Sequence, residues 1–131
     1  MSGQYLILIA EDQPHVLMAL EHLVQSVPDT IIITAQDGPH AVNKALNRKP
    51  HLVILAASLP QIDGHLAARM IRDQWDEQNH RGKIWLTAGQ LEKTSQTDAQ
   101  EAGADQIITN PFDPNLVVDL LKQAVFTASS T

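Results

Sequence analysis

The sequence predicts a single α/β domain in which helices cover both faces of a doubly wound, five-stranded parallel sheet. Three observations predict this fold class. Short, continuous apolar runs recur along the chain, as in strands buried on both faces. Between these runs lie segments whose apolar residues follow the period of a helix. The chain has 131 residues, which is enough for one core and too few for two ordinary domains.

Five apolar runs are the expected strands. They are YLILIA (5 to 10), TIIITA (30 to 35), LVILA (52 to 56), KIWLTA (83 to 88) and QIIT (106 to 109). Strands that alternate with helices favour a parallel sheet. Right-handed crossovers and one reversal of strand order then predict a cleft outside the carboxyl ends of the strands.

Helical periodicity marks the segments between the strands. The first helix is expected to start at Pro14, which suits a first helical turn. The residues expected to face inward are Val16, Leu17, Leu20, Leu23, Val24 and Val27, then Ala41, Val42, Ala45 and Leu46, then Leu66, Ala67, Met70, Ile71 and Trp75, and finally Leu116, Val117, Leu120, Leu121 and Ala124. The segment 91 to 102 has helix formers but little apolar surface, so this fourth helix is expected to be the least firmly packed. Trp85, in the middle of a strand, is expected in the core with Trp75.

Composition excludes several classes of function. Fifteen acidic against nine basic residues give a net charge of −6, which argues against direct binding to nucleic acid. No apolar run is long enough to span a membrane, and the start MSGQY does not resemble a secretory signal. The absence of cysteine excludes disulfides and thiol nucleophiles and fits a cytoplasmic location. We expect a domain over 1–126, with 127–131 as a flexible tail or the start of a linker.

Functional residues are expected where the strands end. The residues at those positions are Glu11, Asp12, Ala56, Thr87 and Asn110. The six histidines are scattered and show no spacing typical of a metal site. Asp63, in an Asp-Gly turn, is expected to shape its loop.

Four segments, taken together and in order, carry a resemblance to a known family. They are IAEDQP (9 to 14), LVILAASLPQIDG (52 to 64), LTAG (86 to 89) and GADQIITNPF (103 to 112). From about residue 5 to residue 125 the chain resembles the receiver domain of bacterial two-component response regulators. This resemblance implies a flavodoxin-like (βα)5 fold with strand order 2-1-3-4-5. It also implies a cis peptide at the proline of the last segment.

The resemblance implies phosphoryl transfer from a histidine kinase to an aspartate at the end of the third strand. In the family an acidic pair helps to hold Mg²⁺, and a hydroxyl and a lysine bind the phosphoryl group. By position, Glu11 and Asp12 match the acidic pair and Thr87 matches the hydroxyl. Ala56 occupies the acceptor position and Asn110 occupies the lysine position.

These two departures predict that the usual reaction does not occur at the usual place. An acyl phosphate needs a carboxylate, which Ala56 lacks, and Mg²⁺ prefers several oxygen ligands. Phosphoryl charge is normally neutralised by metal and lysine together. Losing the aspartate and the lysine together keeps the local charge balance unchanged.

The resemblance assigns further positions. Thr87, Ala88 and Pro111 form the remnant of the phosphoryl pocket, and Ile107 occupies the family's switch position. Glu11, Asp12 and Ser58, the last through its backbone carbonyl, would hold a metal weakly if at all. Separately from the resemblance, Val118 and Val125 are seven residues apart and lie off the main apolar stripe of the last helix. With Phe126 they are expected to form a modest exposed apolar strip, which is a candidate interaction face.

We therefore expect a pseudo-receiver without enzyme activity that acts by protein–protein interaction. Its expected partners are a histidine kinase, another response regulator, a linked output domain or a second copy of the chain. The alternative is a receiver that still takes part in phosphorelay through Ser58 or Thr87, with weak Mg²⁺ binding. A third hypothesis, a flavodoxin-like ligand binder, lacks a glycine-rich phosphate loop to support it.

Overall fold

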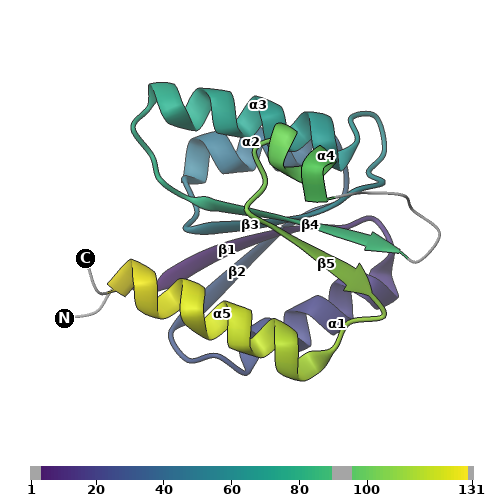
Figure 1. The fold of residues 1–131 in the computed structure, drawn as a ribbon, viewed down its shortest axis with the longest axis vertical. Coiled ribbons are helices and arrows are strands. Elements are labelled where there is room, and N and C mark those ends of the chain that lie inside the picture. Colours follow the sequence, from purple (N-terminus) through teal and green to yellow (C-terminus); the bar gives the residue numbers. More distant parts are fainter. Residues whose placement is uncertain (1–3, 90–95, 130–131) are drawn as a thin grey trace.

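Five parallel strands form one sheet in the order β2-β1-β3-β4-β5, as expected (Figure 1). The computed structural model describes residues 4–89 and 96–129, and the side chains of 4–89 and 97–125. The strands are β1 (Tyr5–Ala10), β2 (Thr30–Ala35), β3 (Leu52–Ala56), β4 (Lys83–Gly89) and β5 (Gln106–Asn110). β1 and β3 lie side by side although β2 intervenes in the sequence. The strand order therefore reverses at this pair, which places a cleft at its carboxyl end.

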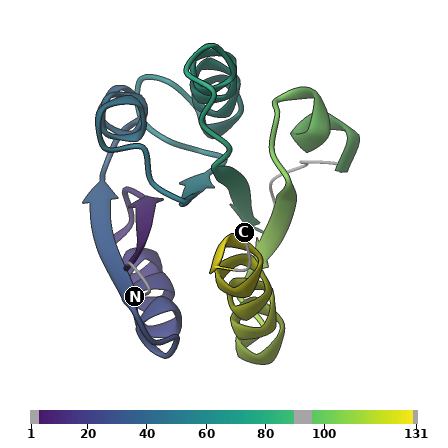
Figure 2. The same cartoon turned by 90° about the vertical axis from the view of Figure 1, so that its left-hand side faces the viewer.

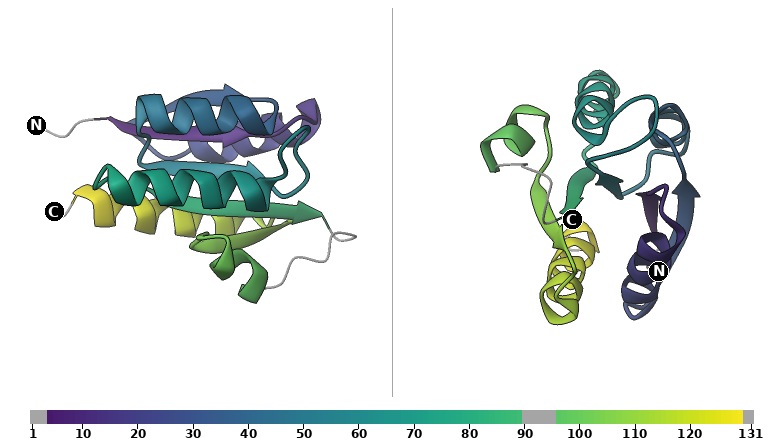
Figure 3. Two further views of the ribbon diagram at one scale, coloured as in Figure 1. Left: turned by 90° about the horizontal axis from the view of Figure 1, so that it is seen from above. Right: turned by 90° about the vertical axis from the view of Figure 1, so that its right-hand side faces the viewer.

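Helices cover both faces of the sheet. The helices are α1 (Pro14–Gln25), α2 (Gly38–Arg48), α3 (Gly64–Glu77), α4 (Gln96–Glu101) and α5 (Pro114–Ser129). α2, α3 and α4 lie on one face, and α1 and α5 lie on the other (Figures 1 and 2). β1 begins and α5 ends at the same end of the molecule, opposite the carboxyl ends of the strands (Figure 3).

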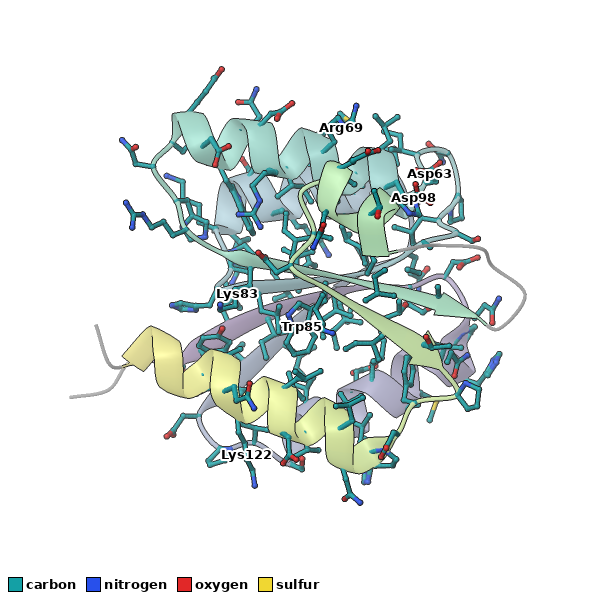
Figure 4. The ribbon with its side chains drawn as sticks, viewed as in Figure 1. Asp63, Arg69, Lys83, Trp85, Asp98 and Lys122 are labelled. Carbon is teal, nitrogen blue, oxygen red and sulfur yellow. The ribbon has the colours of Figure 1, made fainter. Side chains whose placement is uncertain are left out.

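Each face of the sheet has its own apolar core. Trp75 of α3 is fully buried in the core under α2, α3 and α4. Trp85 of β4 is 3% exposed in the core under α1 and α5, and Figure 4 shows it between the sheet and α5. From Leu52 to Leu55, neighbouring residues of β3 alternate between the two cores, as the period of a strand requires. Both tryptophans are therefore core residues, as the sequence predicts.

Aspartate side chains cap α2 and α3 where these helices start near the carboxyl ends of the strands. Asp37 accepts a hydrogen bond from the backbone N–H of His40 (2.8 Å), at the start of α2. Asp63 accepts one from the N–H of Leu66 (2.9 Å), at the start of α3. These bonds satisfy donors that the first helical turn leaves without a partner. The expected role of Asp63 in shaping its loop is thus explained by a helix cap.

The bounds of the strands agree more closely with the sequence prediction than the inward-facing residues of the helices do. β1, β2 and β3 have the expected bounds, and β4 and β5 each extend one residue further, because Gly89 pairs with Asn110. Part of the expected fourth helix, at 91–95, lies outside the described residues. Three inward assignments are wrong, since Leu66, Met70 and Leu116 are 50%, 37% and 53% exposed.

The wrong assignments lie outside the buried stripes of their helices. The buried face of α5 is formed by Val117, Leu121 and Ala124, at spacings of four and three residues. Leu116 precedes this stripe by one residue, or about 100° around the helix. In α3 the buried face is formed by Gly64, Ala67, Ala68, Ile71 and Trp75, and both Leu66 and Met70 lie more than about 100° from its centre.

Candidate functional site

A small pocket opens at the carboxyl ends of the strands. Its volume is about 110 Å³, and it is lined by Glu11, Gln13, Val16, Ala56, Ser58, Thr87, Ala88, Gly89 and Asn110. The pocket thus joins the ends of β1, β3, β4 and β5 with the first turn of α1. This is the place at which the strand order predicts a cleft.

Glu11 supplies a buried carboxyl group to this pocket. It is 6% exposed, and its Oε2 accepts a hydrogen bond from the backbone N–H of Gln13 (3.1 Å). Burial raises the pKa of Glu11, and the neighbouring Asp12 carboxylate adds to this rise. Asp12 itself is exposed and does not line the pocket. The acidic pair is therefore divided between a buried and a solvated position.

Ala56 contributes a methyl group at the end of β3. The residue is 6% exposed, and the chain after it turns back so that the N–H of Gly64 bonds to the carbonyl of Ala57 (2.9 Å). A Cβ atom at residue 64 would lie 2.1 Å from the Ala56 carbonyl oxygen. Glycine is therefore required where α3 starts against the rim. The backbone N–H of Ala57 also bonds to the Thr87 carbonyl (2.8 Å), which fixes β3 against β4.

The far wall of the pocket comes from β4 and β5. Thr87 and Ala88 are buried at the end of β4, with exposures of 4% and 5%. Asn110 ends β5, is half-buried and lines the pocket with its neutral amide. The peptide bond between Asn110 and Pro111 is cis, as the resemblance implies, but Pro111 is exposed and does not line the pocket.

The remaining predicted positions lie away from the pocket. Ile107 is half-buried and packs on the core under α2, α3 and α4. Val118 and Val125 are half-buried against the opposite core, so the expected strip on α5 is only partly exposed. The side chain of Phe126 lies outside the described residues.

The structure brings together Glu11, Ala56, Ser58, Thr87, Ala88 and Asn110, which are six of the residues that the sequence singles out. Sequence reasoning missed Gln13, Val16 and Gly89. The helical period places Val16 in the core alone, although it also forms a wall of the pocket. Gln13 could have been placed in the pocket from its position in the sequence, because it lies between the acidic pair and Pro14, the first residue of α1.

The residues that line the pocket supply one buried carboxyl group (Glu11), two side-chain amides (Gln13 and Asn110) and two hydroxyl groups (Ser58 and Thr87). Within the part of the chain that the structure describes, no three His, Asp or Glu side chains are grouped to hold a metal ion. None of the described helices is both long and apolar enough to cross a membrane.

Comparison with known proteins gives the family. The model of the response regulator receiver domain matches residues 7–122. Over 112 residues the chain is 32% identical to the alkaline phosphatase synthesis transcriptional regulatory protein PhoP of Bacillus subtilis, covering 85% of this chain and 44% of PhoP. It is 26% identical to the chemotaxis protein CheY of B. subtilis, covering 91% of this chain and 96% of CheY. The chain thus spans less than half of PhoP but nearly all of CheY.

Solved structures agree with these relatives. The signal receiver domain of an HD domain-containing protein from Pseudomonas fluorescens Pf-5 superposes with a TM-score of 0.81. The two chains are 26% identical, and the match covers 98% of this chain and 99% of the other. The sheet order, the rim pocket and the family match over 7–122 together show that this chain belongs to the response regulator receiver domain family.

Proposed function

We propose that this chain is a receiver domain that no longer accepts a phosphoryl group at the end of β3 and that signals by binding other proteins. One observation carries this proposal. The residue that ends β3 and lines the rim pocket is Ala56, which has no atom that can form an acyl phosphate. The neutral Asn110 across the pocket supports the same conclusion, because it cannot neutralise phosphoryl charge as a lysine does.

The residues of the pocket also fit a magnesium ion poorly. Mg²⁺ prefers octahedral oxygen ligands, usually with one or two carboxylates. Ala56 supplies none, and the one carboxyl group in the pocket lining is that of the buried Glu11. Asp12 lies outside the pocket lining. We infer that Glu11, Asp12 and the Ser58 carbonyl would hold Mg²⁺ weakly at best, and that the chain needs no metal to act.

The proposed mode of action is occupation of a surface that a competent receiver would use. Candidate partners are a histidine kinase, another response regulator or an output domain. The candidate contact face on α5 includes the 53% exposed Leu116 and the half-buried Val118 and Val125. One exposed apolar side chain beside two partly exposed ones on the same helix supports α5 as the binding element.

A second candidate function is phosphorelay through a hydroxyl group. It is favoured by the position of Ser58 and Thr87, which both line the pocket. In that case one of these hydroxyls would replace the missing carboxylate. Phosphate uptake would then require Mg²⁺ and would be abolished in one of the variants Ser58→Ala and Thr87→Val.

The experiment that tests the proposal is intact-mass measurement after incubation with a small acyl-phosphate donor and Mg²⁺. We expect no phosphorylated species in the natural chain. The matched variant is Ala56→Asp with Asn110→Lys, which restores both missing groups and is expected to gain one phosphoryl group. That gain would show that the rest of the pocket is competent and that the two residues alone silence it.

A stable phosphoryl adduct on the unchanged chain would contradict the proposal. Mapping the adduct by fragmentation would then distinguish Ser58 from Thr87. A phosphoserine or phosphothreonine also resists hydroxylamine, whereas an acyl phosphate on a carboxylate does not. The two candidate functions therefore give opposite results in one measurement.

A further inference from the structure

The outer edge of β2 has the composition of a strand that pairs with another strand. β2 reads TIIITA, with four β-branched residues in its first four positions, no charged residue and no proline. It lies at the edge of the sheet, and Figure 2 shows no described element beside its outer edge (blue). Ile31 is 38% exposed, and Ile32 and Ile33 are only half-buried. Natural edge strands usually carry charges, proline or bulges that prevent such pairing.

The hydrogen-bond pattern shows which backbone groups face outward. The N–H of Tyr5 bonds to the Asp29 carbonyl (2.7 Å), and the N–H of Glu11 bonds to the Ala35 carbonyl (3.0 Å). In a parallel pair, alternate residues of a strand bond to the same neighbour. The odd-numbered residues of β2 therefore face β1.

It follows that Thr30, Ile32 and Thr34 direct their N–H and C=O groups away from the sheet. A separate contact supports this direction, because Lys44 of α2 donates a hydrogen bond from Nζ to the Thr34 carbonyl at the edge. This contact occupies one lone pair of one outward carbonyl. A carbonyl oxygen has two lone pairs, so the Thr34 carbonyl can accept a further bond.

We propose that the β2 edge binds the β2 edge of a second copy of this chain, in an antiparallel pair with its two-fold axis at Ile32. In this register Ile32 lies opposite Ile32 of the second copy, and Thr30 lies opposite Thr34. All three outward residues then form hydrogen-bonded pairs. The result is a continuous sheet of ten strands, five from each copy.

Charge complementarity identifies the occupant as a second copy. Asp29 is exposed directly before β2, and the exposed Lys44 lies on Thr34 at the other end of the strand. Antiparallel pairing brings the Asp29 end of each copy to the Lys44 end of the other, on both sides of the axis. The strand between these charges is neutral, so two chains of net charge −6 meet without a like-charge contact there.

The proposed contact is small. One strand pair buries less than the roughly 1,200 Å² of a standard stable interface, so we expect a weak dimer with a Kd between about 1 µM and 1 mM. Sedimentation velocity of the full chain over this concentration range measures it directly. The edge is independent of the proposed function, because it contains none of the pocket residues and none of α5.

Two sets of variants test the register. Thr34→Pro removes an outward N–H and leaves the ladder with β1 intact, so we expect the Kd to rise at least about tenfold with the fold retained. Asp29→Lys and Lys44→Glu should each weaken the dimer by opposing like charges. The double variant should restore it, because each charge then again faces its opposite in the other copy. Asp73→Lys, at an exposed position of α3, is the matched control and should leave the Kd unchanged, whereas Leu116→Glu reports on the α5 face.

A cross-link supplies the geometric test. The chain has no cysteine, so a single introduced thiol is unique. Ile32→Cys places two thiols on the axis, within the Cα separation that a disulfide needs. Ile31→Cys places them more than about 7 Å apart although residue 31 is more exposed, so we expect rapid oxidation to a dimer only for Ile32→Cys.

A chain that stays monomeric to about 1 mM would overturn the proposal. So would a dimer that Leu116→Glu weakens and Thr34→Pro does not, since that dimer uses the α5 face. Faster cross-linking of Ile31→Cys than of Ile32→Cys would exclude the register. Circular dichroism and thermal unfolding of each variant confirm that a loss of dimer is not a loss of fold.

Discussion

At the start of β3, the ring of His51 lies against Tyr5 and accepts a hydrogen bond from the neighbouring strand. The Nδ1 atom accepts the backbone N–H of Leu6 (3.0 Å), and the His51 and Tyr5 rings stack with centroids 4.7 Å apart. Only an unprotonated Nδ1 can accept this bond. Burial lowers the pKa of His51, and the nearby His80 lowers it further.

This arrangement predicts a loss of stability in mild acid. The unfolded chain takes up a proton on His51 near pH 6.5, whereas the folded chain resists it, so stability falls as the pH drops below that value. We expect the free energy of unfolding to fall by less than about 1 kcal/mol through loss of the Leu6 bond, because His51 is exposed to solvent. Urea unfolding of the natural chain and of His51→Asn, across that pH window, measures the difference.

The amide oxygen that His51→Asn introduces can accept the same N–H without titrating. Subtracting the pH profile of this variant from that of the natural chain isolates His51 from the other five histidines. Parallel profiles for the two proteins would show that His51 has no part in the acid dependence.

Gly64 is a residue whose side chain must be absent. A Cβ atom there would lie 2.1 Å from the Ala56 carbonyl oxygen and 2.9 Å from the Ala57 Cα, both of them backbone atoms. We expect Gly64→Ala to lower the free energy of unfolding by more than about 2 kcal/mol, because α3 must move away from the rim. Asp73→Ala, at an exposed position of the same helix, is the control for helix propensity and should change stability little. Equal stability of the two variants in urea would contradict the steric argument.

At the scale of elements, one side chain joins α3 to two loops. Arg72 donates from Nη1 to the Gly82 carbonyl (2.9 Å), from Nε to the Gly103 carbonyl (3.1 Å) and from Nη2 to Oδ2 of Asp105 (2.9 Å). The same Asp105 oxygen accepts the N–H of Ile84 (2.8 Å). Arg72 therefore connects α3 to the starts of both β4 and β5.

We expect Arg72→Lys to destabilise the chain by about 1–3 kcal/mol, although the charge is retained. A lysine ammonium on a flexible stem cannot reproduce the planar arrangement of donors that reaches three acceptors at once. Hydrogen exchange should rise first in α4 and β5, because α4 has only six residues and little apolar surface. Arg81→Lys at an exposed site is the matched control, and uniform exchange changes in both variants would exclude this role.

Elements differ in how much of them the sequence predicts. β1, β2 and β3 could be predicted to the residue because a short run of apolar and β-branched residues beside helical segments favours a strand. β4 and β5 extend further because Gly89 and Asn110 pair with each other, and pairing across strands is not visible in either segment alone. Glu11 and Thr87 could be placed at the site because parallel strands end at one edge. Gln13 and Gly89 could not, because their place in the pocket depends on how the loops after the strands turn.

At the scale of the whole molecule, two cores share one sheet. β3 is buried along its whole length, and its residues alternate between the two cores from Leu52 to Leu55. The loss of either core would therefore also disrupt the strand that the other core packs against. The chain has two tryptophans, and they lie on opposite faces: Trp75 in one core and Trp85 in the other. Each tryptophan is therefore a natural probe of one layer.

We expect the two layers to unfold together. In the single-tryptophan variants Trp75→Phe and Trp85→Phe, fluorescence and far-ultraviolet circular dichroism should give the same urea midpoint within each protein. Adding Leu121→Ala opens a cavity under α5 only and should lower the free energy of unfolding by about 2–5 kcal/mol. The urea midpoint of the Trp75 fluorescence, in the opposite core, should then shift as far as the midpoint of the dichroism signal. A Trp75 transition that stays in place while the dichroism signal moves would show that the layers unfold separately. In that case the sheet would not couple the two faces, and a partner bound on α5 would leave the packing under α2 and α3 unchanged.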